Sequence, residues 1–152
     1  MTITREIARE EDRKGSGGAP SQGEGALVRE GPTILLVDDE EMVRSLLEEL
    51  LCGEGYRVLT AASGEEAVEV YREHAADIEL VFLDLLMAGM GGEKCLRELL
   101  GIDPSARVIL TSGNASTDMA RELLEAGARD FLDKPFKIDR LLQAVRGALD
   151  ES

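Results

Sequence analysis

Short hydrophobic runs alternate with helical patterns along most of this 152-residue chain, and this alternation limits its fold more than any other feature. Runs of this length are typical of strands that are buried on both faces of a parallel sheet. Strands are expected at residues 33–37, 56–61, 78–84, 107–111 and 130–133. Helices are expected from about 42 to 51, from 63 onward, from the loop at 87–92 to about 100, from 116 or 117 to 127, and from 138 to 149.

Five successive strand–helix units predict an α/β fold. Because right-handed crossovers connect parallel strands, the helices should cover both faces of the sheet. An eight-unit barrel needs roughly 250 residues, whereas the alternating pattern occupies only about 120 residues, at 33–150. The predicted fold is therefore a doubly wound, five-stranded parallel sheet with five helices, which forms one domain at residues 33–150.

Residues 1–32 have a different composition. The segment Gly15–Gly25 reads G-S-G-G-A-P-S-Q-G-E-G, which is typical of a linker. The charged segment before it has few apolar residues. We therefore expect residues 1–32 to form a flexible tail or tether.

The charge of the chain narrows its range of partners. With 17 basic and 31 acidic residues, the net charge is −14. A surface of this sign repels nucleic-acid phosphates and anionic lipid headgroups, so binding to nucleic acids or membranes is not expected. It favours basic protein surfaces and divalent cations.

The cysteines and the lack of long apolar segments indicate a cytoplasmic protein. Cys52 and Cys95 have no metal-ligand spacing and fit free thiols in a reducing compartment. No run approaches the roughly 18 apolar residues that span a membrane, and the N-terminus has no apolar signal core.

Polar residues follow the expected strands at the point where each strand ends. They are Asp38 and Asp39, then Asp84, then Thr111, and finally Lys134. Ligands of open parallel sheets bind at the carboxyl ends of the strands, so these side chains should converge there.

Three converging carboxylates need a neutralising partner. Two carboxylates about 4 Å apart repel by roughly 4 kcal/mol at an effective dielectric near 20. Protons, the ammonium of Lys134 or a metal ion could offset this repulsion. Mg²⁺ prefers carboxylates, waters and substrate phosphate as ligands. The cluster predicts a metal-assisted phosphate site in which one carboxylate is free to act as a nucleophile. Taken alone, Asp38 or Asp39 would also fit a helix cap.

Four segments together resemble a known family. They read I-L-L-V-D-D-E-E, V-F-L-D-L-L-M-A-G-M-G-G, V-I-L-T-S-G and G-A-R-D-F-L-D-K-P-F. In this order and spacing they resemble the receiver domain of two-component response regulators over residues 33–150. The resemblance implies a flavodoxin-like sheet with strand order 2-1-3-4-5. The chain has Ala88 where the family usually has proline.

The resemblance also implies the role of each acidic residue. Asp84 would be the phospho-acceptor, which takes a phosphoryl group from a histidine of a sensor kinase. Asp39 would bind Mg²⁺ directly, and Asp38 would bind it largely through water. The backbone carbonyl of Leu86 and the carboxylate of Asp84 would complete the protein ligands.

Three further residues would transmit the signal. Thr111 would move its hydroxyl onto the phosphoryl oxygens, and Lys134 would pair with them. Phe131 would respond and alter the surface formed by the fourth helix, the fifth strand and the fifth helix. The bond between Lys134 and Pro135 is expected to be cis, a state that is essentially confined to X–Pro bonds.

Two other functions compete with this interpretation. A Mg²⁺-dependent phosphatase with an aspartyl nucleophile generally needs an acid two residues after the nucleophile, where this chain has Leu86. A nucleotide- or flavin-binding domain needs a phosphate-binding loop after the first strand, where this chain has D-D-E-E, which would repel phosphate. Catalysis beyond self-phosphorylation and self-dephosphorylation is not expected of the chain itself.

The expected partners are a sensor histidine kinase or phosphotransfer protein, an unidentified target protein and, weakly and after phosphorylation, a second copy of the chain. The pattern stops with the helix that ends near residue 149. It therefore predicts either a stand-alone receiver or the C-terminal receiver of a longer hybrid histidine kinase.

Overall fold

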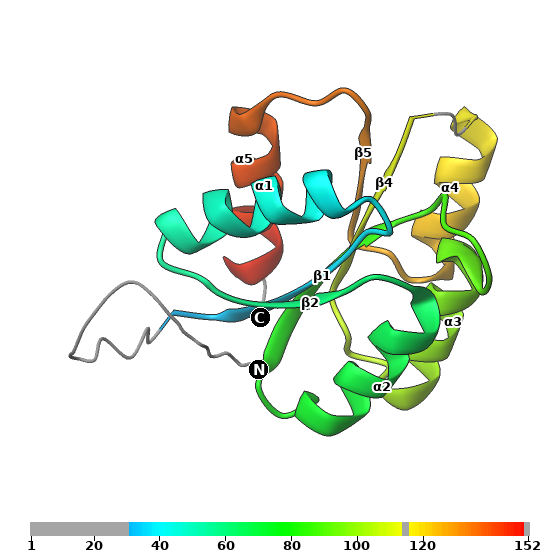
Figure 1. The fold of residues 1–152 in the computed structure, drawn as a ribbon. Coiled ribbons are helices and arrows are strands. Elements are labelled where there is room, and N and C mark those ends of the chain that lie inside the picture. Colours follow the sequence, from blue (N-terminus) through cyan, green and yellow to red (C-terminus); the bar gives the residue numbers. More distant parts are fainter. Residues whose placement is uncertain (1–30, 114–115, 151–152) are drawn as a thin grey trace. The chain divides into compact units, whose positions relative to one another are not determined.

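The structure, a computed structural model, describes residues 31–113 and 116–150 (Figure 1). The expected tail at residues 1–32 lies outside the described residues, apart from its last two. Strands and helices alternate throughout the described part. The strands are β1 (Thr33–Val37), β2 (Arg57–Ala61), β3 (Ile78–Asp84), β4 (Val108–Ser112) and β5 (Asp130–Asp133). The helices are α1 (Glu41–Gly53), α2 (Gly64–His74), α3 (Gly91–Ile102), α4 (Thr117–Ala126) and α5 (Ile138–Asp150).

The five strands form one parallel sheet in the order β2-β1-β3-β4-β5. The doubly wound fold and the strand order 2-1-3-4-5 are thereby confirmed. The chain leaves β1 toward one edge, forms β2, and then crosses back to form β3 on the other side of β1. The strand order therefore reverses between β1 and β3, and in open α/β sheets such a point is where ligands bind.

Successive residues of each strand point to opposite faces of the sheet and pack into two hydrophobic cores, one on each face. Figure 1 shows α1 and α5 on one face, and α2, α3 and α4 on the other. The core under α1 and α5 contains Ile34, Leu36, Leu80, Phe82, Ile109 and Leu132 from the strands. The opposite core contains Leu35, Val37, Val81, Leu83, Val108 and Leu110. Burial on both faces explains why β1, β3 and β4 are almost continuously apolar.

Two strand boundaries differ from the expected ones by one residue. The Tyr56 N–H donates to the Leu51 carbonyl at the end of α1, so Tyr56 belongs to the turn and β2 begins at Arg57. The Arg57 N–H in turn donates to the Pro32 carbonyl. β4 is shifted from 107–111 to Val108–Ser112, although the Arg107 carbonyl still accepts a hydrogen bond from the Val81 N–H.

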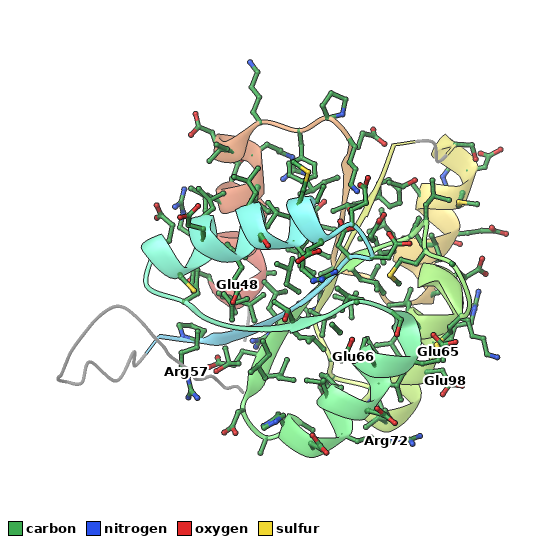
Figure 2. The ribbon with its side chains drawn as sticks, in the orientation of Figure 1. Glu48, Arg57, Glu65, Glu66, Arg72 and Glu98 are labelled. Atoms are coloured by element: carbon green, nitrogen blue, oxygen red, sulfur yellow. The ribbon has the colours of Figure 1, made fainter. Side chains whose placement is uncertain are left out.

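Local side chains define where the helices begin. Ser63 caps α2, because its hydroxyl accepts from the Glu66 N–H at 3.1 Å. The Glu66 carboxylate, labelled in Figure 2, reaches back to the Ala62 N–H at 2.8 Å, one residue before the expected partner of a capping box. Ser116 caps α4 through the Met119 N–H. Within the described ranges, no helix is long and apolar enough to span a membrane.

Candidate functional site

The carboxyl ends of the strands bring the predicted polar residues to one edge of the sheet. Asp38 follows β1 directly, and Asp84 is the last residue of β3. Val37 pairs with Leu83, so Asp38 and Asp84 leave adjacent strands at the same level. Asp84 pairs in turn with Thr111 of β4, and Lys134 follows the end of β5. The expected convergence of these residues is present in the structure.

Three carboxylates form a compact cluster at this edge. Oxygen atoms of Asp38, Asp39 and Asp84 all lie within 4.8 Å of one another. Asp38 and Asp84 are only 2% and 4% exposed, whereas Asp39 is exposed. The Lys134 Nζ lies 3.5 Å from an oxygen of Asp38 and 3.5 Å from an oxygen of Asp84. One ammonium therefore lies against two of the three carboxylates, and its single charge offsets theirs only in part.

Hydrogen bonds hold Asp38 from several directions. Its N–H donates to the Ala61 carbonyl at 3.2 Å, and its Oδ1 accepts from the Glu40 N–H at 2.9 Å. Its backbone carbonyl accepts from Nη1 of Arg44 at 2.7 Å. Glu40 is the residue at the N-cap position of α1, and it makes no side-chain cap. Asp38 thus braces the turn before the helix, and its other carboxylate oxygen faces the cluster.

The environment of Asp84 disfavours its charged form. Burial raises the pKa of the Asp84 carboxyl above its ordinary value, and the neighbouring Asp38 carboxylate raises it further. The Lys134 ammonium and the Leu86 N–H, which donates to Oδ1 at 3.2 Å, only partly offset these effects. A bound cation would favour the ionised form.

The loop after Asp84 depends on glycine. The Gly92 N–H donates to the Leu85 carbonyl at 3.0 Å. A Cβ atom at Gly92 would clash with the Leu85 Cα and would lie 2.7 Å from the Asp84 carbonyl oxygen. Gly89 and Gly91 adopt positive φ angles of 78° and 76°. The glycines therefore let α3 begin directly against the end of β3.

The side chains of Thr111 and Phe131 lie on opposite faces of the sheet. Thr111 is buried and pairs with Leu132, which lies in the core under α1 and α5. Phe131 pairs with Leu110 and packs against the other core. The carbonyl of Thr111 accepts from the Leu85 N–H at 2.8 Å, which links the end of β4 to the loop after Asp84.

The remaining predicted site residues border the cluster. The side chain of Leu86 is 61% exposed. The Lys134–Pro135 peptide bond is cis, and the Lys134 N–H donates to the Ser112 carbonyl at 2.9 Å.

Two contributors to the site were missed from the sequence. Arg44 and Gly92 both contact the backbone next to a carboxylate, and neither belongs to a motif with a known chemical role. The position of each residue in the sequence nonetheless offers a signal. Arg44 lies within the first two turns of the helix that follows the paired aspartates, and Gly92 ends the G-M-G-G run.

The chemistry of the cluster fits Mg²⁺. Three carboxylates supply hard oxygen ligands, the class that Mg²⁺ prefers. The net negative charge of the cluster matches a divalent cation, and the exposed Asp39 leaves one side open to solvent and substrate.

Comparisons with known proteins identify the family of this chain. The model of the response regulator receiver domain family matches residues 34–146. Chemotaxis protein CheY of Bacillus subtilis is 39% identical over 118 residues, which cover 77% of this chain and 97% of that protein. Sensor kinase CckA of Brucella abortus is 38% identical over 119 residues, which cover 78% of this chain but only 13% of the kinase.

A solved structure agrees with the sequence comparison. The CheX-CheY-BeF3-Mg²⁺ complex of Borrelia burgdorferi contains a chain with 34% identity and a TM-score of 0.76. The match covers 79% of this chain and 90% of that one. Together with the strand order and the acidic cluster at the carboxyl edge, these matches lead to one conclusion: the chain belongs to the family of response regulator receiver domains of two-component systems.

Proposed function

We propose that the chain is a phosphorylation switch that accepts a phosphoryl group on Asp84 from a phosphohistidine of a sensor kinase or phosphotransfer protein. The observation that supports this proposal most strongly is the position of Asp84. Its carboxylate is buried and lies between an ammonium and two further carboxylates. This arrangement suits an oxygen nucleophile that attacks a highly charged phosphoryl group.

Each residue of the cluster has a defined task in this proposal. The carboxylates of Asp38, Asp39 and Asp84 and the Leu86 carbonyl would hold Mg²⁺, which supplies positive charge beside the phosphoryl oxygens. An Asp84 oxygen attacks phosphorus, the bond from phosphorus to the histidine nitrogen breaks, and the nitrogen keeps the electron pair. Lys134 pairs with the phosphoryl oxygens, and the Thr111 hydroxyl donates to them.

Lys134 also supports the nucleophile before transfer. Its Nζ lies 3.5 Å from Asp84 and lowers a pKa that burial and Asp38 raise. Only the ionised carboxylate is an effective nucleophile. Lys134 therefore enlarges the fraction of Asp84 that can react.

The proposed output runs from Thr111 through the end of β4 to Phe131. Because the two side chains lie on opposite faces of the sheet, a shift of Thr111 would reach Phe131 through the strand backbone. Phe131 lines a groove of about 800 Å³ together with residues of the β5–α5 loop and α5. A change in its ring position would reshape the surface of α4, β5 and α5 for a target protein, or for a second copy in a weak dimer.

The phosphoryl donor must dock beside the acidic cluster to bring its histidine to Asp84. A largely apolar groove of about 460 Å³ between α1 and the β5–α5 loop reaches Lys134. Leu46 lines it and is 65% exposed, and Met42, on the same helix, is 86% exposed. Exposed apolar side chains this close to the site support docking of a helix of the donor protein here.

The competing phosphatase function is less well supported. Leu86 occupies the position where that mechanism needs an acid, and its apolar side chain cannot transfer a proton. Both a stand-alone receiver and a receiver within a hybrid kinase remain part of the proposal, because relatives of both kinds match this chain. The proposed location is the cytoplasm, where soluble phosphotransfer partners would meet it.

Incubation with acetyl phosphate and Mg²⁺ tests the function directly. We expect intact-protein mass spectrometry to detect one phosphoryl group per chain, labile to hydroxylamine as an acyl phosphate is. The group should be absent from the Asp84→Asn variant and from samples with excess EDTA. Continuous release of phosphate from many substrates without a stable adduct would favour the phosphatase instead.

Removal of the Lys134 charge should raise the pKa of Asp84 further. The Lys134→Met variant lacks the ammonium that opposes the effects of burial and Asp38 on this pKa. Carboxyl-carbon NMR titration in metal-free buffer should therefore show Asp84 ionising at higher pH than in the wild type. Lys137→Met, which removes an exposed lysine of the same loop, serves as the control. An unchanged or lower pKa in Lys134→Met would contradict the assigned role.

A charge placed in the groove between α1 and the β5–α5 loop should slow phosphorylation by a donor protein. It should leave phosphorylation by the small molecule acetyl phosphate unchanged. For a purified sensor kinase that phosphorylates the wild type, we expect Leu46→Glu to slow transfer about tenfold or more, equivalent to about 1.4 kcal/mol of docking energy. Phosphorylation by acetyl phosphate should be unchanged. Leu124→Glu introduces the same charge at an exposed leucine of α4 and should not slow transfer. Equal transfer to wild type and Leu46→Glu would rule out this docking surface.

A further inference from the structure

Arg44 of α1 is tied to the backbone of the acidic cluster. Its side chain is half-buried, and Nη1 donates to the Asp38 carbonyl at 2.7 Å. Hydrogen bonds from a charged guanidinium are shorter and stronger than neutral ones. We propose that Arg44 is a positioning residue, which fixes the peptide between Asp38 and Asp39 so that both carboxylates face the metal. This inference rests on the proposed Mg²⁺ site.

The geometry of the turn explains why this carbonyl matters. The Asp38 carbonyl and the Asp39 N–H belong to one planar peptide group. Rotation about the Cα–C bond of Asp38 would turn the carbonyl away from Arg44 and would also displace the Asp39 Cα and its carboxylate. The Asp38 N–H is already fixed to β2 through the Ala61 carbonyl at 3.2 Å. Arg44 holds the opposite side of the same residue, and the turn is thereby constrained at both ends.

The first turn of α1 has no side-chain cap at its N-terminus, so a hydrogen bond from elsewhere helps to fix it. Glu40 occupies the N-cap position without a side-chain cap, so the usual local device for fixing the first turn is not used. The Oδ1 of Asp38 accepts from the Glu40 N–H, but this bond engages a carboxylate that also serves the cluster. Arg44 reaches back from inside the helix and binds the backbone, which leaves the carboxylates available.

Charge and position predict opposite effects of removing Arg44. A guanidinium near three carboxylates repels an incoming cation, so loss of its charge alone would strengthen Mg²⁺ binding. Loss of positioning would weaken Mg²⁺ binding, because the ligands would no longer be held together before the ion arrives. A purely structural role would lower stability and leave the affinity of the folded protein unchanged. The sign of the change in affinity therefore separates the three possibilities.

Calorimetric titration with Mg²⁺ tests the inference on the full chain. We expect Arg44→Met to raise the dissociation constant about tenfold, the lower end of the range for groups that orient metal ligands. Arg44→Lys should lose less of the affinity for Mg²⁺, since lysine keeps the positive charge and a hydrogen-bond donor but lacks the planar guanidinium. Arg72→Met makes the same chemical change at the far end of α2, labelled in Figure 2, and should bind as the wild type does.

Unchanged or tighter Mg²⁺ binding by folded Arg44→Met would overturn the inference, with folding checked by circular dichroism. If that variant does not fold, Arg44→Lys decides: affinity equal to or above that of the wild type would overturn it. Absence of Mg²⁺ binding by the wild-type chain would instead overturn the proposed metal site on which the inference rests.

Discussion

Mutual repulsion among Asp38, Asp39 and Asp84 is the constraint on which the rest of the site depends. Their oxygens lie within 4.8 Å of one another, and two of the three residues are nearly inaccessible to water. A protein selected for stability alone would not keep such a cluster, because buried like charges cost free energy. The same arrangement favours binding of a cation and a phosphoryl group, since the groups that hold them are already in place.

The topology of the sheet brings the members of this cluster together. β1 and β3 are adjacent only because the chain crosses back over β1 after forming β2. Their carboxyl ends then bring Asp38 and Asp84 together, and β4 and β5 add Thr111 and Lys134 on one side. Two continuous cores hold the strands in register. The sheet thereby positions the charges at one edge.

Much of this arrangement was predictable from the sequence, and the exceptions share a cause. The five strands were predictable because doubly buried strands are apolar runs, and Asp84 and Lys134 were conspicuous where such runs end. The sequence pattern places Tyr56 in a strand, although its N–H closes the end of α1. The sequence pattern does not reveal Arg44 and Gly92, because both act through backbone atoms. Arg44 donates to a carbonyl six residues earlier, and Gly92 lets two backbone segments approach closely. Residue patterns report side-chain burial well but report such backbone contacts poorly.

The stability of the Asp84→Asn variant tests the central claim most directly. Asparagine keeps the shape of the side chain and removes the charge that burial and Asp38 disfavour. Urea unfolding at neutral pH in EDTA should therefore show the variant to be more stable than the wild type, and added Mg²⁺ should stabilise the wild type much more than the variant. A less stable variant in EDTA, or equal stabilisation of both proteins by Mg²⁺, would contradict the account.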